Sequence, residues 1–268
     1  MMNYRTLLLL PSMACLCFGC NTVSGTSRTQ FNAYSVQEEI DLGTRTFAQM
    51  TRDEQRIEDG PEFDMVMRVT ARIAEATIER HPEIAGRFEW EVVLLDDEDV
   101  ANAWALPGGK MAVYSGILPY TQNEDGLAVV LGHEAAHAIA RHGGENMSRA
   151  GLVSVLSVGT SLATDGEYDE VISAAGAAYG LLGEPAFSRS QESEADELGL
   201  FITAQAGYDP RMAITLWERM AARGGGVPEF LSTHPSEATR ISRLEAAMPK
   251  AMAIYRVHID REGSSSGD

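Results

Sequence analysis

Two histidines and a glutamate interrupt an otherwise apolar segment in the middle of the chain. His133, Glu134 and His137 lie in a stretch that predicts a helix from Glu124 to about His142. Successive helical residues are rotated by about 100°, so the two histidines lie one turn apart on the same face. Two neutral imidazoles so placed can bind one cation, and Glu134 can reach a water on that cation. The spacing predicts a catalytic metal site; the alternative is a helix whose histidines are satisfied by carboxylates.

A catalytic zinc site needs a third protein ligand and an open position. The segment from about Ser188 to Ala206 predicts a second helix, which begins with several carboxylates. Glu192 and Asp196 are one turn apart on it, whereas Glu194 points in roughly the opposite direction. Glu192 can be the third ligand, and Asp196 can accept a hydrogen bond from the outer nitrogen of a ligating histidine. The alternative is a solvated acidic face, but two adjacent carboxylates repel each other unless a cation lies beside them.

The composition of the 268-residue chain excludes several other classes of protein. There are 21 basic and 39 acidic residues, which gives a formal net charge of −18. A surface this negative repels phosphate backbones, so nucleic acid is not expected as a partner. All three cysteines, Cys15, Cys17 and Cys20, lie at the N-terminus. A thiolate metal site, a catalytic cysteine and a disulfide framework are therefore excluded from the folded body.

The N-terminal residues have the layout of a secretory signal. Arg5 precedes a short apolar stretch, residues 6–19, which is too short to span a membrane. The sequence that ends at Cys20 resembles a bacterial lipobox, so Cys20 is the predicted lipidation site. Cys15 is a weaker alternative, and an ordinary cleavage site near Cys20 is another. Residues 1–19 are thus predicted to be a lipoprotein-type signal peptide.

The signal determines the expected location. Residues 20–34 are rich in Ser, Thr, Gly and Asn and predict a flexible tether. A protein with these features is expected in the periplasm, attached to a membrane by its lipid anchor. Thr22 is not the aspartate that inner-membrane retention would need, which favours the outer membrane.

Periodicity and turn signals predict a mostly helical α+β domain over residues 35–250, with one small sheet. Two small-residue stretches predict a buried helical hairpin, with a lid or a membrane-touching surface as the alternatives. Residues 251–268 are expected to form a C-terminal tail with a disordered end. The small-residue stretches are 151–164 and 171–182; the remaining helices are expected at 36–58, 61–80, 210–223 and 236–248, a strand at 88–95, and a hairpin from 102–106 and 111–114.

Four motifs, in order along the chain, resemble one enzyme family. They are Asn102 to Gly109, Val130 to His142, Ser188 to Asp196, and Thr233 to Arg240. The likeness is to the minigluzincin metallopeptidases, the family of HtpX and the CAAX prenyl proteases, and it covers about residues 36–247. Within the family it is expected to be closest to periplasmic lipoproteins such as LoiP and BepA. It implies a zincin-like metallopeptidase domain with an active-site helix and one Zn²⁺ per chain.

The resemblance also implies roles for residues beside the metal ligands. Asp196 is expected to contact His133, and Arg240 is either an oxyanion donor or a salt-bridge partner that holds a loop. His234 has three interpretations: a catalytic residue of the cleft, an extra metal ligand in a closed resting state, or a turn histidine. His142 is interpreted as a helix-terminal histidine that favours the helix dipole.

The strand at 102–106 is expected to lie along the cleft as an edge. A bound peptide would pair with its backbone, which gives binding that tolerates many sequences. If the strand is ordinary sheet, Trp104 is only a core residue. The residues assigned to substrate binding are Asn102, Ala103, Trp104 and Ala105.

These inferences predict a zinc-dependent endopeptidase that cleaves unfolded or misassembled envelope proteins. Zinc would lower the pKa of its bound water and polarise the scissile carbonyl, and Glu134 would be the general base. His234 is the second catalytic candidate. The alternative function is a zinc-stabilised periplasmic chaperone or assembly factor, which would not need Glu134. A third is a lipid-anchored binding module without metal.

Overall fold

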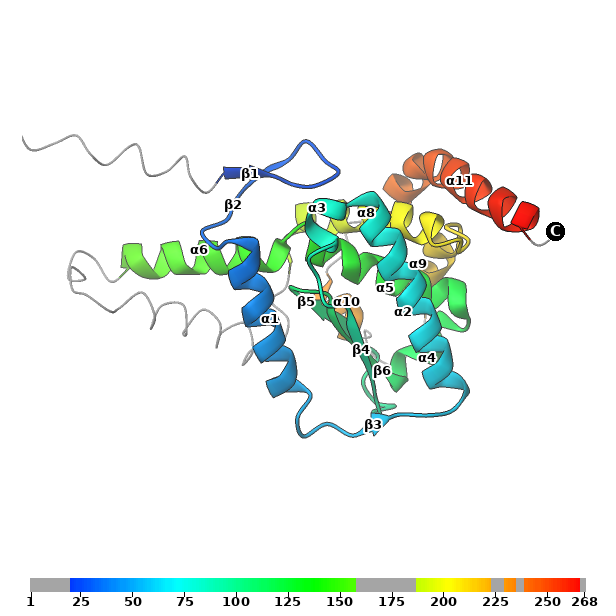
Figure 1. Ribbon diagram of the computed structural model, residues 1–268, viewed down its shortest axis with the longest axis horizontal. Helices are drawn as coiled ribbons and strands as arrows, with labels where there is room; N and C mark the ends of the chain where they lie inside the picture. The colour runs from blue at the N-terminus through cyan, green and yellow to red at the C-terminus, as the bar shows by residue number, and fades with distance from the viewer. Residues whose placement is uncertain (1–19, 158–186, 223–228, 235–238, 266–268) are drawn as a thin grey trace, which may run out of the picture.

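The computed structural model describes residues 20–157, 187–222, 229–234 and 239–265. In these ranges helices surround a small four-stranded sheet, and a separate two-stranded hairpin lies near the N-terminus, which is the α+β, mostly helical class predicted (Figure 1). None of the described helices is both long enough and apolar enough to cross a membrane. The helices used below are α1 (Val36–Met50), α2 (Pro61–Arg80), α5 (Glu124–Ile139), α6 (His142–Ser157), α8 (Arg189–Gln205), α9 (Met212–Ala222), α10 (Glu229–Thr233) and α11 (Arg240–Ser265), with short α3 (Pro82–Ala85) and α4 (Leu118–Thr121) between them.

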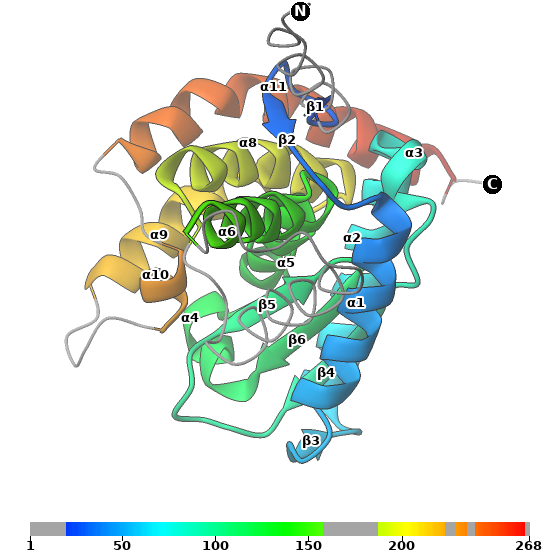
Figure 2. The same ribbon diagram turned by 90° about the vertical axis from the view of Figure 1, so that its left-hand side faces the viewer.

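The sheet has four strands in the order β3-β4-β6-β5. The predicted hairpin is present as β5 (Ala103–Leu106) and β6 (Lys110–Tyr114), which pair antiparallel. β4 (Glu91–Leu95) lies parallel to β6 on the other side, and β3 (Arg56–Ile57) closes the far edge. β5 is therefore an edge strand of this sheet, at the side nearest α5 in Figure 2.

Alternation along the strands divides the sheet side chains between two apolar clusters. Ala103 and Ala105 of β5 belong to the main core, together with residues of α2, α5 and α8. Trp104 and Leu106 point to the opposite face, where they pack with Phe47 of α1. The Phe47 and Trp104 rings meet edge to face, with centroids 5.9 Å apart. Helix α5 and helix α1 thus cover opposite faces of the sheet.

Two glycines allow the helices that carry the predicted ligands to approach closely. Gly132 of α5 lies against Gly199 of α8, and a Cβ atom on Gly199 would be 2.8 Å from the backbone nitrogen of His133. Both helices begin at residues suited to N-capping: Asn123 accepts a bond from the backbone of Gly126, and Ser188 forms a capping box with Gln191. The start of each helix, and hence the rotation of its faces, is defined locally.

The predicted helix 124–142 is interrupted near its end. α5 stops at Ile139, and α6 begins at His142 and continues through Gly143 and Gly144 to Ser157. Arg141 between them has φ of 58°, which is uncommon for a residue other than glycine. Its guanidinium donates 3.1 and 2.7 Å hydrogen bonds to the Glu39 carboxylate of α1. This buried ion pair accompanies the turn that separates the two helices.

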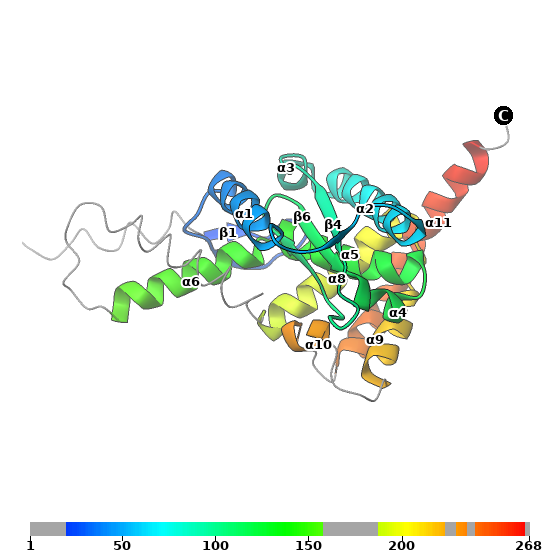
Figure 3. The same cartoon turned by 90° about the horizontal axis from the view of Figure 1, so that it is seen from below.

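The chain termini differ from the expected tether and tail. Residues 20–34 contain a hairpin, β1 (Cys20–Thr22) and β2 (Thr29–Phe31), that lies beside α6 and α8 (Figure 2). The composition is that of a linker, but Arg28 forms ion pairs with Glu145 and Glu194 of the body. At the other end α11 runs through residues expected as a tail and projects from the body (Figure 3).

The other predicted elements mostly agree with the structure. The helices expected at 61–80, 188–206 and 210–223 are α2, α8 and α9. The first helix is shorter than expected because it ends at Met50, where Thr51 bonds back to the carbonyl of Phe47. The small-residue stretch at 171–182 lies outside the described residues, as does most of the one at 151–164, whose first residues belong to α6.

Candidate metal centre

Four buried side chains converge between α5 and α8. His133 and His137 come from α5, Glu192 from α8, and His234 follows α10. Each offers one potential ligand atom, and these atoms all lie within 4.8 Å of one another. The four residues are at most 2% exposed. Two of the predicted ligands are one helical turn apart, as their spacing required, and the third arrives from a helix more than 50 residues later.

The distances within the cluster fit a shared cation. The Nε2 atoms of His133 and His137 are 3.0 Å apart and face each other. The Glu192 carboxylate lies 3.5 Å from the first and 3.4 Å from the second. Its buried Oε1 has no hydrogen-bond donor within the described residues. A buried carboxylate oxygen without a donor is costly, and two imidazoles with one carboxylate are a donor set of catalytic zinc. The residues present therefore fit Zn²⁺.

The electrostatics of the cluster favour a positive charge at its centre. Burial raises the pKa of Glu192, but its interactions with the adjacent His133 and His137 rings outweigh this and hold that pKa well below its usual range. Burial lowers the pKa of His137 well below its usual value, and lowers that of His234 to about 3. Both imidazoles are thus neutral near pH 7, the form that binds a metal.

Asp196 and Arg240 contact two of the candidate ligands, His133 and Glu192. The Asp196 carboxylate lies 3.1 Å from Nδ1 of His133, so it can accept that proton and leave Nε2 free to face the centre. Arg240 donates to Glu192 at 2.9 Å and to Asp196 at 2.6 and 3.0 Å. A further Arg240 nitrogen lies 3.3 Å from the carbonyl of His234. Arg240 is therefore occupied as a clamp on two carboxylates and the His234 loop.

Glu134 and His234 lie next to each other at the centre. Oε1 of Glu134 is 3.4 Å from Nε2 of His234, and both side chains are buried. The His234 ring stacks on Phe230 with centroids 4.5 Å apart, and its Nδ1 is 3.1 Å from the Phe230 carbonyl. These contacts direct Nε2 of His234 toward the ligands rather than into solvent. The position agrees with either a cleft residue or an extra ligand and does not resemble a free turn.

The backbone groups of β5 alternate between β6 and the outer edge of the sheet. Asn102 accepts a bond from Tyr114, which makes the Ala103–Val113 and Ala105–Met111 pairs the non-hydrogen-bonded ones. The amide and carbonyl groups of Ala103 and Ala105 consequently point away from β6, toward the outer edge. The side chain of Asn102 already accepts the Ala103 amide at 2.9 Å. Trp104 is buried against α1 and belongs to the core, as the alternative interpretation held.

Two residues at the site were not anticipated. His142 was interpreted as a helix-terminal histidine, but it is fully buried and its Nδ1 lies 2.9 Å from Nδ1 of His137. Phe187 stacks on the His137 ring at 4.0 Å. The only sequence signal for His142 was its place in the motif of the metal helix. Its contact depends on the turn at Arg141, which spacing along an uninterrupted helix does not predict.

This donor set on two packed helices, with a glutamate beside the first histidine, is that of a zinc metallopeptidase, and the chain is a zinc metalloendopeptidase. It belongs to peptidase family M48, whose sequence pattern matches residues 62–248. The zincin-like fold and the zinc requirement predicted from the motifs are therefore confirmed.

Curated relatives match at moderate identity. The mitochondrial metalloendopeptidase OMA1 of Saccharomyces cerevisiae is 36% identical over 243 residues, which cover 85% of this chain and 69% of that protein. The OMA1 protein of Schizosaccharomyces pombe is 43% identical over 169 residues, 61% of this chain and 48% of that protein. The β-barrel assembly-enhancing protease of Yersinia pestis is 32% identical over 160 residues, 55% of this chain and 32% of that protein.

These relatives correct the predicted location. The periplasm and outer membrane were expected, but the OMA1 relatives from two yeasts, Arabidopsis thaliana and human are mitochondrial proteins. The prediction was wrong because it depended on a short apolar stretch and one cysteine, which specify a compartment poorly. A particular closeness to periplasmic lipoproteins is likewise not established. Lipidation of Cys20 stays a prediction.

Proposed function

We propose that this metallopeptidase performs protein quality control by cleaving unfolded or misassembled protein chains. The observation that supports this is the outer edge of β5, where the carbonyl of Ala103 and the amide and carbonyl of Ala105 point away from β6, while the Ala103 amide is bound by the Asn102 side chain. Pairing through backbone groups requires an extended substrate and reads little of its sequence. A folded protein presents few such segments, whereas an unfolded chain presents many. The preference for unfolded chains would therefore come from backbone geometry.

The chain's own residues divide the catalytic work. Bound zinc supplies Lewis-acid polarisation of the scissile carbonyl and a water of lowered pKa. His133, His137 and Glu192 hold that ion. Glu134 takes the proton of the attacking water and delivers it to the leaving amine. His234, whose Nε2 lies 3.4 Å from Glu134, is proposed to line the cleft beside that proton transfer. We do not propose Arg240 as an oxyanion donor, because its guanidinium already donates to the carboxylates of Glu192 and Asp196 and to the carbonyl of His234.

The test compares the wild type with Glu134→Gln, a change that keeps the side-chain volume and leaves the metal ligands in place. We expect the wild type to degrade an unfolded substrate such as casein and to spare a stably folded protein. The variant should bind zinc stoichiometrically and lose cleavage by at least about 100-fold, in keeping with general-base catalysis. Undiminished cleavage by the variant would exclude Glu134 as the base.

Substrate class is tested separately from chemistry. One protein is presented in its folded form and in a destabilised variant with the same cleavable sequences. Cleavage that tracks the unfolded fraction supports quality control. Equal rates on both forms would refute the unfolded-chain preference while the peptidase activity stands. Suppression of aggregation by Glu134→Gln, with no cleavage by the wild type, would instead favour the chaperone function.

The lipid anchor at Cys20 is an independent part of the proposal. A chain with Cys20→Ser should lose incorporation of a labelled fatty acid if the lipobox is used, with Cys15→Ser as the matched control. Equal labelling of both variants and the wild type would exclude Cys20 as the attachment point.

A further inference from the structure

His142 lies between a metal ligand and a carboxylate, although nothing in its spacing suggested either contact. Its Nδ1 is 2.9 Å from Nδ1 of His137, and its Nε2 is 3.0 Å from Oε2 of Glu194. The His142 side chain is fully buried, and that of Glu194 is 9% exposed. Glu194 lies on the side of α8 away from Glu192. The helix that supplies the third ligand therefore also supplies a carboxylate to His142.

His137, His142 and Glu194 form a series of contacts, and the carboxylate at its end determines which nitrogen atoms donate and which accept. A carboxylate only accepts, so Nε2 of His142 carries the proton that it donates to Glu194. Neutral His142 then has an unprotonated Nδ1, which can only accept. The proton in the 2.9 Å contact must come from Nδ1 of His137. Nε2 of His137 is left unprotonated and faces His133 and Glu192, as a metal ligand requires.

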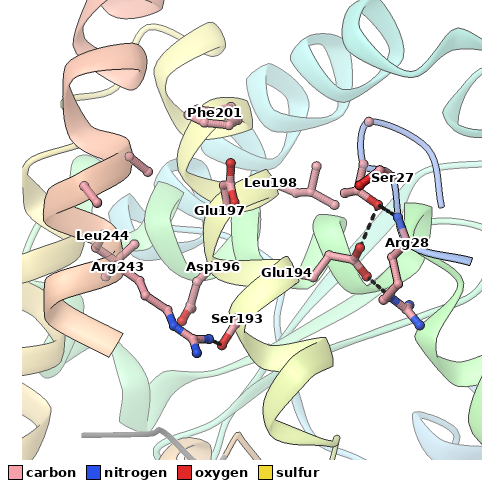
Figure 4. Close-up of a pocket in the computed structure, with 14 residues that line it drawn as sticks. Ser27, Arg28, Ser193, Glu194, Asp196, Glu197, Leu198, Phe201, Arg243 and Leu244 are labelled. Carbon is pink, nitrogen blue, oxygen red and sulfur yellow. Dashed lines mark hydrogen bonds and ion pairs between the residues drawn. The ribbon is translucent and has the colours of Figure 1, made fainter. Parts of the chain in front are cut away.

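The N-terminal hairpin holds the Glu194 carboxylate in place. Thr26 donates to one Glu194 oxygen at 2.8 Å, and Arg28 donates to the other at 2.8 Å. Arg28 also reaches Glu145 of α6 at 2.9 and 3.1 Å. Thr26, Arg28 and Glu194 line one end of a groove of about 660 Å³. Figure 4 shows Glu194 extending from α8 toward Arg28. At the other end of the groove Arg243 contacts Ser193 and does not touch Glu194.

We propose that His142 and Glu194 are positioning residues that set the tautomer and ring orientation of His137, and that the hairpin acts on the metal site through Arg28. The proposal rests on the assignment of His137 as a zinc ligand. Asp196 contacts His133 directly, whereas Glu194 reaches His137 only through the His142 ring between them. The two imidazoles are therefore held by independent carboxylates, both from α8. Only the second depends on residues that precede the family-matched region at residue 62.

The first experiment exchanges the acceptor at residue 142 while changing the volume little. In His142→Asn the amide oxygen occupies nearly the place of Nδ1 and can still accept from His137, whereas His142→Leu offers no acceptor. Zinc affinity of the metal-free protein is measured by competition with a chromophoric chelator. We expect His142→Leu to bind zinc about 10- to 100-fold more weakly than the wild type, and His142→Asn to recover most of that loss.

A packing role predicts the reverse order, because leucine is better suited than asparagine to a buried site without hydrogen bonds. His142→Leu with wild-type affinity, or a weaker His142→Asn, would therefore overturn the proposal. Long-range ¹H–¹⁵N spectra of metal-free protein labelled at histidine give a second readout. They should show the proton of His137 on Nδ1 in the wild type and redistributed in His142→Leu. Unchanged signals in that variant would also contradict the proposed role.

The second experiment tests the hairpin. Arg28→Met removes the guanidinium from Glu194, and Arg243→Met removes an arginine from the other end of the same groove. We expect about a tenfold loss of zinc affinity in Arg28→Met, the lower end of the range for such outer partners, and none in Arg243→Met. Equal affinities would exclude the hairpin from the metal site. If the wild type itself binds no zinc, the metallopeptidase assignment fails. If the wild type binds zinc and the His142 and Arg28 variants bind it equally well, only the positioning role fails.

Discussion

Replacement of Arg240 by methionine separates two roles that the sequence left open for this residue, oxyanion donor and structural clamp. Arg240 is 5% exposed, and its guanidinium contacts the carboxylates of Glu192 and Asp196. It also lies over the Trp217 ring, 3.6 Å from the centroid. Methionine fills much of the same volume but provides neither charge nor donors. The variant therefore leaves two buried carboxylates without their shared cation.

The size of the effect follows from the burial of this cluster. The side chains of Arg240, Glu192 and Asp196 are 4%, 3% and 9% exposed. Removing one partner of a buried ion pair costs about 3–5 kcal/mol, because the remaining charge stays desolvated. For a chain of this size each kcal/mol lowers Tm by about 2–4 °C, so we expect a fall of roughly 10 °C in the metal-free protein. Arg240→Lys keeps the charge but loses the forked guanidinium that contacts both carboxylates, so its Tm should lie between those of the wild type and Arg240→Met.

Urea unfolding in the presence of a chelator measures this loss without interference from metal binding. The matched control is Arg211→Met, which breaks an arginine–carboxylate pair with Asp209 whose arginine is 67% exposed. That change should leave stability nearly unchanged, because an ion pair at the surface is screened by solvent. A different outcome would refute the clamp: if Arg240→Met stays within about 1 kcal/mol of the wild type but cleaves substrate at least about 100-fold more slowly, Arg240 acts on the substrate itself.

Two further predictions concern the approach of the site helices and the protons on the ligands. Gly199→Ala should weaken zinc binding and reduce stability by about 1–3 kcal/mol, because the new Cβ would meet the backbone of His133 at 2.8 Å; Glu197→Ala, on an exposed position of the same helix, is the control. Calorimetry in buffers of different ionisation enthalpy should show about one proton released per zinc near pH 6.5. Burial lowers the pKa of His133, but bonds to Asp196 and Glu192 outweigh this and raise it, whereas burial keeps His137 neutral. Zinc affinity should then fall about tenfold for each unit of pH below the pKa of His133. Release of no proton would show that His133 is already neutral in the metal-free protein.

Helical periodicity alone places the residues predicted as ligands. His133 and His137, four residues apart, must share a face, and Glu192 and Asp196 must share another. The N-caps and the apolar runs locate both helices to within a few residues. What remained was to bring the two faces together, and Gly199 at the crossing allows that approach. This part of the site is encoded locally in the sequence.

The contacts of His142 and the N-terminal hairpin could not be predicted in the same way. The helix break depends on a left-handed Arg141 whose partner, Glu39, is 102 residues away in the chain. The hairpin has the composition of a linker, and only pairing of Arg28 with distant carboxylates distinguishes it from one. Neither pairing leaves a period or a motif in the sequence. Long-range ion pairs of this kind are visible only in the fold.

The carboxylates of α8 explain why the orientations of both His133 and His137 depend on this one helix. Glu192 and Asp196 face the centre, and Glu194, rotated by about 200° from Glu192, faces the hairpin. A residue that spacing placed opposite Glu192 and Asp196 thus contacts His142, which in turn contacts His137. Rotation of α8 about its axis would displace the third ligand and both supporting carboxylates together. The clamp of Arg240 on one face and the contact of Arg28 on the other oppose such a rotation from opposite sides. Loss of either should therefore loosen the metal site, but Arg240 acts on a ligand directly and Arg28 acts through two intervening side chains.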